Sequence, residues 1–369
     1  MARSIIPKPL LALPWRVLFV ILAIGGFGLV VLYSAAGGHA RPWASSQGFK
    51  FAVFLGMALV MSRIRVAWWR DVAWPGYLAI LVLLVAVEAL GAVSGGSRRW
   101  LDLAVIRLQP SELMKLTIVL ALAKFYDQLP LGEVRGWNAI WPAAVAIGLP
   151  FVLVLTQPDL GTATMIVAGG VVVVFLAGVP MRLFAGAGAL IAAAMPVVWL
   201  GMHDYQRNRV LIFLDPESDP LGTGYHITQS KIAIGSGGVF GKGFLQGTQS
   251  HLDYLPEGHT DFVFATMAEE WGLAGGVFII GGFLLLTRWG LKVAARAPTR
   301  FGRLTAAGLT TTIFFYVAIN LMMVMGLAPV VGIPLPLVSF GGSAMLTVML
   351  CIGMLMSIDR ESREGRRYG

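Results

Sequence analysis

The densest run of polar side chains in the sequence spans residues 251–262, His-Leu-Asp-Tyr-Leu-Pro-Glu-Gly-His-Thr-Asp-Phe. It contains two His-x-Asp pairs, His251 with Asp253 and His259 with Asp261. Two histidines and two carboxylates could bind a metal ion, although this spacing matches no established pattern of metal ligands. The alternative for most of these side chains is a solvated loop. Asp261 differs because an apolar segment follows it directly. A helix start there would stabilise the carboxylate and weaken it as a base, whereas apolar burial would have the opposite effect.

Glu112 and Lys115 lie three residues apart near the start of another apolar segment. This spacing puts both side chains on one face of a helix, where they can form an ion pair. Charges inside a bilayer are costly and commonly functional. Two interpretations stay open: a structural pair that fixes helix packing, or a pair that lines a substrate site opening outward.

Asp159 lies in the sequence Gln-Pro-Asp-Leu-Gly at residues 157–161, between two apolar segments with almost no loop. A carboxylate at such a turn can cap the following helix by accepting hydrogen bonds from its free N–H groups. We favour this capping role for Asp159 over a catalytic one.

Residues 235–243, Gly-Ser-Gly-Gly-Val-Phe-Gly-Lys-Gly, resemble a phosphate-binding loop but depart from its pattern. The first glycine of GxxxxGK[ST] would fall at Ser236, and Gly243 follows Lys242 where Ser or Thr is required. We therefore expect no nucleotide cofactor. Lys242 stays a candidate for binding a lipid-linked phosphate, because flexible backbone surrounds it.

The composition shows which elements must position these residues. Of the 369 residues, 57% are hydrophobic and 13% are charged, against about 45–50% and about 25% in soluble domains. These values exclude a soluble domain and a disordered chain. The single cysteine, Cys351, excludes an internal disulfide and a cysteine metal cage. The net charge of +9 does not point to nucleic acid, because in a membrane protein the positions of the charges matter more than their sum.

Ten segments are long and apolar enough to cross a bilayer, which needs about 20 residues each. We predict one all-α integral membrane domain over residues 1–369, with a large extracytoplasmic loop at 203–260 between spans 7 and 8. The predicted transmembrane helices lie near 17–36, 48–62, 75–93, 111–126, 139–156, 161–178, 183–202, 266–288, 304–326 and 341–358. The first is too long and too glycine-rich to be a removable signal peptide.

The basic residues give the direction of these spans. With the N-terminus inside, most of the 28 lysines and arginines fall on inner segments, so both termini are predicted to be cytoplasmic. A minority lies outside, mainly in segments 94–110 and 203–260. These could be ordinary loop charges, or they could bind an anionic ligand at the outer face. The candidates are Arg98, Arg99, Arg207, Arg209 and Lys242.

Proline and glycine are dense at residues 332–343, Gly-Ile-Pro-Leu-Pro-Leu-Val-Ser-Phe-Gly-Gly-Ser. This density predicts a broken or re-entrant segment, which a membrane protein tolerates only where it lines protein or water.

Five sequence blocks, in this order on a chain of ten spans, resemble the SEDS family of bacterial membrane proteins (shape, elongation, division and sporulation). Within that family, the chain is more similar to the RodA branch, which acts in elongation, than to the FtsW branch, which acts in division. The blocks are Arg-Arg-Trp-Leu at 98–101 with Gln-Pro-Ser-Glu-Leu-Met-Lys at 109–115, Gln-Pro-Asp-Leu-Gly-Thr-Ala at 157–163, Gly-Ser-Gly-Gly at 235–238, Leu-Pro-Glu-Gly-His-Thr-Asp-Phe at 255–262, and residues 332–343.

The resemblance implies a peptidoglycan glycosyltransferase in the bacterial cytoplasmic (inner) membrane, with its active site facing outside. Its substrates would be lipid II and undecaprenyl-linked glycan, and its partner a class B penicillin-binding protein, a transpeptidase. Asp261 matches the essential carboxylate of the family, and Glu112 with Lys115 matches its transmembrane ion pair. The resemblance also implies help from a divalent cation, Mg or Mn, with unknown ligands. His259 and Ser343 in the matching blocks are further substrate-binding candidates, and Asp159 and Glu257 are structural or secondary ones.

Two other classes of function fit the same features. A lipid II flippase would also use ten spans and buried charges, but it predicts alternating access and no glycan product. A scaffold for the transpeptidase predicts that Asp261 and Glu112 can be changed without loss of growth. The outer loop that ends at Asp261 favours catalysis, because transport sites usually lie near the bilayer midplane.

Overall fold

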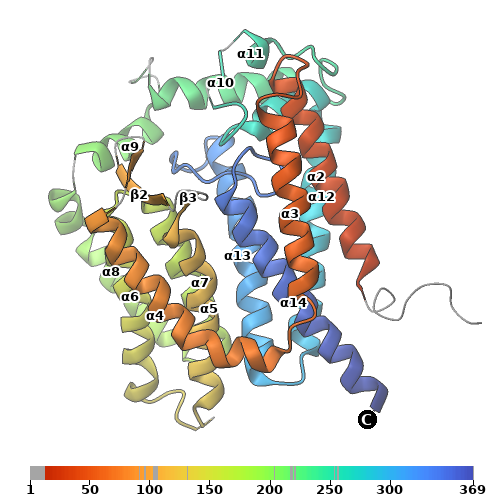
Figure 1. Ribbon diagram of the computed structural model, residues 1–369. Coiled ribbons are helices and arrows are strands. Elements are labelled where there is room, and N and C mark those ends of the chain that lie inside the picture. Colours follow the sequence, from red (N-terminus) through yellow and green to blue (C-terminus); the bar gives the residue numbers. More distant parts are fainter. Residues whose placement is uncertain are drawn as a thin grey trace, which may run out of the picture.

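A computed structural model describes residues 13–90, 92–94, 97–102, 107–130, 132–202, 204–216, 219, 222–252, 254–255 and 257–368. It is a bundle of long helices with shorter helices over one end, while the C-terminal end of the last helix lies at the opposite end (Figure 1). The long helices are α2 (Trp15–Ala35), α3 (Trp43–Met61), α4 (Val66–Leu90), α5 (Pro110–Gln128), α6 (Trp137–Thr156), α7 (Leu160–Ala177), α8 (Met181–Gly201), α12 (Val263–Arg296), α13 (Arg300–Val324) and α14 (Ser343–Tyr368).

Each predicted span corresponds to one of these helices. Within the described residues, nine helices are long and apolar enough to cross a membrane. The exception is α5, which is long enough but carries Glu112, Lys115, Lys124 and Asp127. Its apolar residues are almost all buried, because α5 packs against α4, α6, α7, α13 and α14. The charged residues of α5 are therefore carried by a helix that neighbouring helices enclose on several sides.

Three helices extend furthest beyond the predicted limits. α4 begins at Val66 rather than near residue 75, with Pro75 inside it, and the N–H of Val66 donates to Glu361 Oε1 at 2.7 Å. α12 continues to Arg296 and α14 to Tyr368. In the last turns of α14, an ion pair at spacing i, i+4 joins Arg363 to Asp359 at 2.5 Å. Hydropathy locates the apolar part of a helix, whereas these polar extensions depend on capping and ion pairs.

The region between α4 and α5 differs from the all-α prediction. It contains a small antiparallel sheet of three strands, β1 (Ala92–Ser94), β2 (Ser97–Asp102) and β3 (Arg107–Leu108), with β2 in the middle. Strands of two to six residues are too short to show a clear alternation of apolar and polar residues. The sequence therefore indicates only a loop here.

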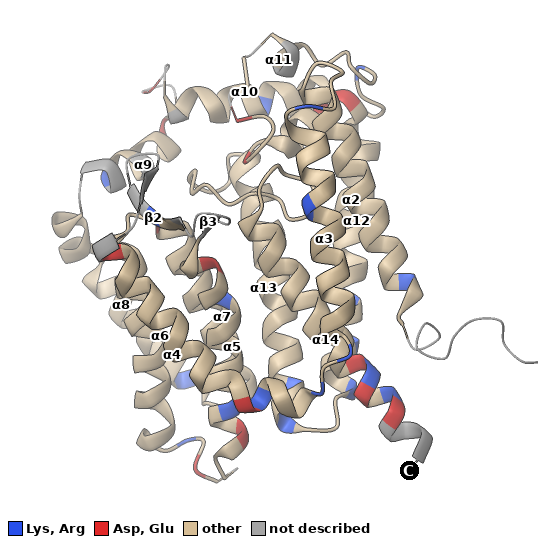
Figure 2. Ribbon diagram, in the orientation of Figure 1, with Lys and Arg blue, Asp and Glu red and all other residues tan. Residues whose placement is uncertain are grey.

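Residues 204–251 contain three shorter helices, α9 (Asp204–Leu214), α10 (Thr223–Ser236) and α11 (Thr248–His251). They lie over the end of the bundle opposite the C-terminal end of α14 (Figure 1). Basic side chains gather at that other end, where α14 finishes (Figure 2). The basic residues therefore gather at one end of the bundle, and the side of the membrane that this end faces stays a prediction.

The glycine-rich segment after α10 is inserted into a break in α12. Gly272 has φ 60° and ψ −154°, which interrupts the helix. In an unbroken helix the N–H groups of residues 273 and 274 would donate to the carbonyls of residues 269 and 270. Here Leu273 N donates to Gly238 O at 2.9 Å and Ala274 N to Val239 O at 3.0 Å. The freed carbonyls of Glu269 and Glu270 accept from Lys242 N at 2.9 Å and Gly243 N at 3.1 Å. Four hydrogen bonds thus replace two.

This insertion requires glycine on both sides of the contact. Gly241 has φ +80°, and a Cβ atom there would lie 2.0 Å from the carbonyl oxygen of Glu270. A Cβ on Gly272 would lie 2.4 Å from the backbone nitrogen of Gly241. Because backbone atoms cannot move aside as side chains can, the motif is explained by close packing rather than by phosphate binding.

We expect the substitution Gly241→Ala to destabilise the protein by about 2–4 kcal/mol, because it adds backbone strain and a backbone clash. The matched control is Gly281→Ala in α12, where a Cβ would meet nothing within 4 Å. That substitution should be neutral or stabilise by up to about 1 kcal/mol. The measurement is the thermal unfolding midpoint of each purified protein in detergent. Equal midpoints for the two variants would show that the inserted segment contributes no stability.

Candidate active site

Asp261 lies in a turn just before α12, close to the start of the helix as predicted. Its Oδ2 lies 3.5 Å from the position that a Cβ atom would take on Gly332, which has φ +72°. Asn320 of α13 donates both to the carbonyl oxygen of Asp261 at 2.9 Å and to that of Ile333 at 2.7 Å. The Asp261 turn and the start of the 332–343 segment are therefore held together by one buried amide, and glycine at 332 leaves room beside the carboxylate.

A second contact joins the same two segments. Phe340 N donates to the carbonyl oxygen of His259 at 2.8 Å. The His259 ring stacks on Trp43 of α3 with centroids 3.9 Å apart, and it also contacts the Phe340 ring at 6.2 Å. On the same helix, Lys50 Nζ lies 4.4 Å above the Phe340 ring. Lys50 is thus an additional cation in this region.

The 332–343 segment is irregular, as predicted, and its polar backbone groups are satisfied by side chains. Gln47 donates to Ser339 O at 2.7 Å and accepts from Gly341 N at 3.2 Å. Ser339 Oγ accepts from Leu335 N at 2.8 Å. Ser343, the last residue of this segment, is half-buried and begins α14. These bonds fix the shape of the segment beside Asp261.

Glu112 and Lys115 form the predicted ion pair, with Lys115 Nζ 2.6 Å from Glu112 Oε1. A third residue completes the cluster: Lys115 Nζ donates to Tyr316 OH at 2.9 Å, and Tyr316 OH donates to Glu112 Oε2. All three side chains are buried. A buried ion pair is tolerated only when additional hydrogen bonds complete it, which is what Tyr316 does.

Tyr316 and Asn320 connect this cluster to the Asp261 turn. They lie four residues apart on α13 and so share one helix face, about 6 Å apart along the axis. One holds Glu112 and Lys115, and the other holds Asp261 and Ile333. Sequence reasoning missed both residues. Two polar residues at spacing i, i+4 in an apolar span are the signal that could have identified them.

The residue that anchors the segment between α10 and α12 was also missed. Glu269 is fully buried in α12, and it accepts from Lys242 Nζ at 2.7 Å, from Thr248 Oγ1 at 3.0 Å and from Gln249 N at 2.9 Å. Lys242, which the sequence suggests for phosphate binding, is held by this carboxylate. The signal in the sequence is two adjacent glutamates, Glu269 and Glu270, inside an apolar span.

The predicted outer arginines bind backbone where their side chains are described. Arg99 donates to the carbonyls of Gln157 and Pro158 at 3.0 and 2.5 Å. Arg207 donates to the carbonyls of Trp199 and Leu200 near the end of α8, at 2.9 and 2.6 Å. For Arg98 in β2 and Arg209 in α9 only the backbone is described.

The two secondary candidates shape turns. Asp159 caps α7 as predicted, accepting from Thr162 N at 3.0 Å, and it also accepts from Gln109 Nε2 at 3.2 Å. Glu257 is exposed with φ +58°; its backbone oxygen accepts from Phe262 N at 3.2 Å, and its carboxylate accepts from Thr260 Oγ1. Both residues therefore stabilise the backbone turns in which they lie.

The two His-x-Asp pairs, for which the sequence leaves open a metal site or a solvated loop, are only partly within the described residues. Asp253 lies outside them, and the side chain of His251 is likewise not described. Among the described side chains, no group of three His, Cys, Asp or Glu residues is arranged to hold a metal ion. This part of the chain therefore offers no ready protein cage for a cation.

Comparison with known proteins identifies relatives along nearly the whole chain. The profile of the FTSW_RODA_SPOVE family, a cell cycle protein family, matches residues 14–364. The chain is 47% identical over 342 residues to the peptidoglycan glycosyltransferase MrdB of Escherichia coli strain K12, with 92% of each chain covered.

Two solved structures are similar in fold. One is a chain from the structure of a peptidoglycan synthase complex that coordinates polymerization and crosslinking. Its TM-score is 0.83 at 34% sequence identity, over 95% of this chain and 99% of that one. The other is the rod shape determining protein RodA of Thermus thermophilus, with a TM-score of 0.72 at 30% identity, over 95% and 98% of the two chains.

We expect Glu112→Gln to lower the stability by about 3–5 kcal/mol, because it leaves the buried Lys115 without its opposite charge. The double variant Glu112→Gln with Lys115→Met removes both charges and should be less destabilised than the single variant. Thermal unfolding midpoints in detergent provide the comparison. If the double variant were the less stable of the two, the ion pair would not be the source of the loss.

A second prediction concerns pH. Burial lowers the pKa of His259 from its ordinary value of 6.5, although Glu257 partly offsets this effect. The folded protein then favours neutral His259 while the unfolded chain takes up a proton, so stability should fall as the pH drops from about 6.5 towards 5. His259→Asn should reduce this slope. Burial also lowers the pKa of His226, so part of the slope should remain; an unchanged slope would contradict the assignment to His259.

Proposed function

This chain belongs to the FtsW, RodA and SpoVE family of cell cycle proteins, and we propose that it polymerises lipid II into glycan strands with Asp261 as the general base. It is a peptidoglycan glycosyltransferase, as its identity to MrdB over most of both chains indicates. The observation that supports the choice of Asp261 is that hydrogen bonds hold its turn in place next to open space. The turn that carries it is tied through Asn320 to the 332–343 segment, and Gly332 leaves space beside the carboxylate.

The proposed reaction joins the 4-hydroxyl of one lipid II sugar to C1 of another pyrophosphate-linked sugar. Asp261 takes the hydroxyl proton, the sugar oxygen forms its bond to C1, and the bond from C1 to the pyrophosphate oxygen breaks. The lipid pyrophosphate leaves with that electron pair. An α-linked donor gives a β-linked product by one inverting displacement, so one base is sufficient.

Negative charge develops on the leaving pyrophosphate, and cations beside it would stabilise the transition state. Arg99, Arg207 and Lys242 already bind groups of the protein itself, which makes them better suited to shaping the site. Lys50 lies beside Phe340 and Gly342, on the segment that continues from Gly332 to Ser343. We therefore add Lys50 to the candidates for the pyrophosphate, together with Arg98, Arg209 and Ser343.

A divalent cation is also part of the proposal, but no step is derived through it. The described side chains supply no cluster of three ligands. Magnesium is commonly held by one or two carboxylates together with substrate phosphates, and the pyrophosphate of lipid II could provide such oxygens.

Family membership also supports a proposal for the topology and the cellular location. We propose ten transmembrane helices with both termini in the cytoplasm, residues 203–260 on the outer side and the active site facing outward in the bacterial inner membrane. The partner is a class B penicillin-binding protein that crosslinks the new strand. The basis is a similar chain found in a peptidoglycan synthase complex that coordinates polymerization and crosslinking.

The test is polymerisation of purified lipid II in detergent by the full-length protein with its transpeptidase partner. Asp261→Asn keeps the shape of the side chain and removes the base, so we expect the rate to fall by about 100-fold or more. The matched control is Glu88→Gln, an exposed carboxylate at the end of α4, which should retain the wild-type rate.

Detergent has no two sides, so polymer formed by the wild type also excludes a protein that only flips lipid II. A wild-type rate for Asp261→Asn, at an unchanged unfolding midpoint, would reject Asp261 as the base. Loss of activity in both variants would point to a general effect of removing acidic charge.

A further inference from the structure

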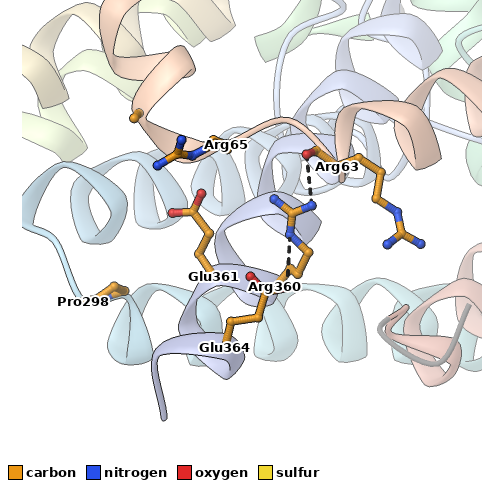
Figure 3. Close-up of a pocket in the computed structure, with 7 residues that line it drawn as sticks. Arg63, Arg65, Pro298, Arg360, Glu361 and Glu364 are labelled. Carbon is orange, nitrogen blue, oxygen red and sulfur yellow. Dashed lines mark hydrogen bonds and ion pairs between the residues drawn. The ribbon is translucent and has the colours of Figure 1, made fainter. Parts of the chain in front are cut away.

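A pocket of about 540 Å³ lies at the end of the bundle where α14 finishes. Three separate parts of the chain meet there: the turn between α3 and α4, the turn between α12 and α13, and the last turns of α14 (Figure 3). Charged side chains dominate its lining, which includes Arg63, Arg65, Pro298, Arg360, Glu361 and Glu364. The guanidinium groups of Arg65 and Arg360 lie near the carboxylates of Glu361 and Glu364, whereas Arg63 contributes its backbone and its guanidinium points away (Figure 3).

Most of these charges already have a structural task. Arg360 donates to the carbonyls of Arg63 and Ile64 at 3.0 and 3.4 Å, and its Nε lies 3.9 Å from Glu364. Glu361 accepts from Val66 N at 2.7 Å and so caps the start of α4. Both carboxylates therefore bind groups of the protein itself, Glu361 at Val66 N and Glu364 at Arg360. These contacts hold the turn between α3 and α4 in place.

Arg65 is different. Its side chain is exposed, and among the described residues its guanidinium makes no hydrogen bond or ion pair. It extends over the pocket from the opposite side to Glu361 (Figure 3). A planar guanidinium with five N–H donors is well suited to bind phosphate oxygens. An anion that enters the pocket would therefore bind Arg65, with Glu361 as the nearest competing charge.

Apolar side chains on both sides of this turn locate the pocket relative to the bilayer. Val60, in the last turn of α3, is 68% exposed, and Trp68, in the first turn of α4, is 49% exposed. Such side chains face lipid in a membrane protein, and tryptophan is enriched where the acyl chains meet the headgroups. Arg65 lies between them in sequence. The mouth of the pocket is therefore at the level of the phospholipid headgroups.

We propose that this pocket binds the phosphodiester headgroup of an anionic phospholipid in the leaflet at the C-terminal end of the bundle. Arg65 holds the phosphate, and the acyl chains run along the exposed face that includes Val60 and Trp68. Arginines at this level of a membrane protein attract anionic headgroups. This site is at the opposite end of the bundle from α10 and α11, so its occupancy can be tested without measuring polymerisation.

The proposal must be separated from the general attraction of the basic end of the bundle to anionic lipid (Figure 2). Arg182 provides the matched control. It is an exposed arginine in the first turn of α8, and it does not line the pocket. Replacing either arginine with glutamine removes one positive charge, but only Arg65→Gln removes it from the pocket.

The experiment measures binding of dioleoyl phosphatidylglycerol to the purified, delipidated full-length protein in detergent. Native mass spectrometry counts the bound lipids and gives their apparent affinity. Dioleoyl phosphatidylcholine tests the need for negative charge, and soluble glycerol 1-phosphate tests whether the headgroup alone is sufficient. We expect one saturable phosphatidylglycerol site. Arg65→Gln should weaken it about fivefold, which is the effect of one arginine near a membrane surface.

Arg65→Lys should retain more of the binding than Arg65→Gln, and Arg182→Gln should leave the affinity of the saturable site unchanged. Equal losses for Arg65→Gln and Arg182→Gln would reject a specific pocket in favour of general electrostatic attraction. Equal affinity for phosphatidylcholine would reject an anionic ligand. Binding of glycerol 1-phosphate as tight as that of the lipid would identify a soluble phosphate compound as the ligand and overturn the lipid assignment.

Discussion

Inside a bilayer, every backbone N–H and C=O group must find a partner within the protein, and the break in α12 meets this constraint in an unusual way. Gly272 ends two helical hydrogen bonds, and residues 238–243 replace them with four. Each group left unsatisfied at this depth would cost several kcal/mol, so the inserted segment and the broken helix stabilise each other. The end of the bundle under α10 and α11 depends on this exchange, because it joins the segment after α10 to the helix that begins next to Asp261.

The buried Glu269 extends the same connection. It lies one turn before the break, and its carboxylate binds Lys242, Thr248 and the backbone of Gln249. A buried carboxylate is costly unless it is paired and hydrogen-bonded. Satisfying Glu269 therefore fixes the start of α11, and with it the chain that continues to the Asp261 turn. On the other side of that turn, Asn320 and Tyr316 on α13 provide a second polar row. The carboxylate proposed as the base is thus positioned by two rows of polar residues on neighbouring helices.

The long elements of this fold could be predicted from the sequence because hydropathy and length determine them. All ten predicted segments correspond to helices, including α5 with its four charged residues. The Glu112–Lys115 pair and the Asp159 cap could also be predicted, since both depend on spacing along one helix. The partners that complete the site could not. Tyr316 reaches Glu112 across more than two hundred residues, and only packing shows that Gly241 meets Gly272. The short strands at 92–108 carry too few residues for a periodic signal.

The arginines show why charge in a loop is a weak guide to ligand binding. A helix leaves its last carbonyl groups without internal partners, and a guanidinium can satisfy two of them at once. Arg207 does this at the end of α8, Arg99 does it at the turn before α7, and Arg360 does it between α3 and α4. The donors of these residues are occupied by the fold. Basic residues near irregular backbone are better candidates for binding a ligand when their N–H groups are not already bound to carbonyls. Lys50 above Phe340 and Arg65 at the end where α14 finishes are two such residues. Sorting basic residues by what their donors bind therefore says more about function than counting them on each side of the membrane.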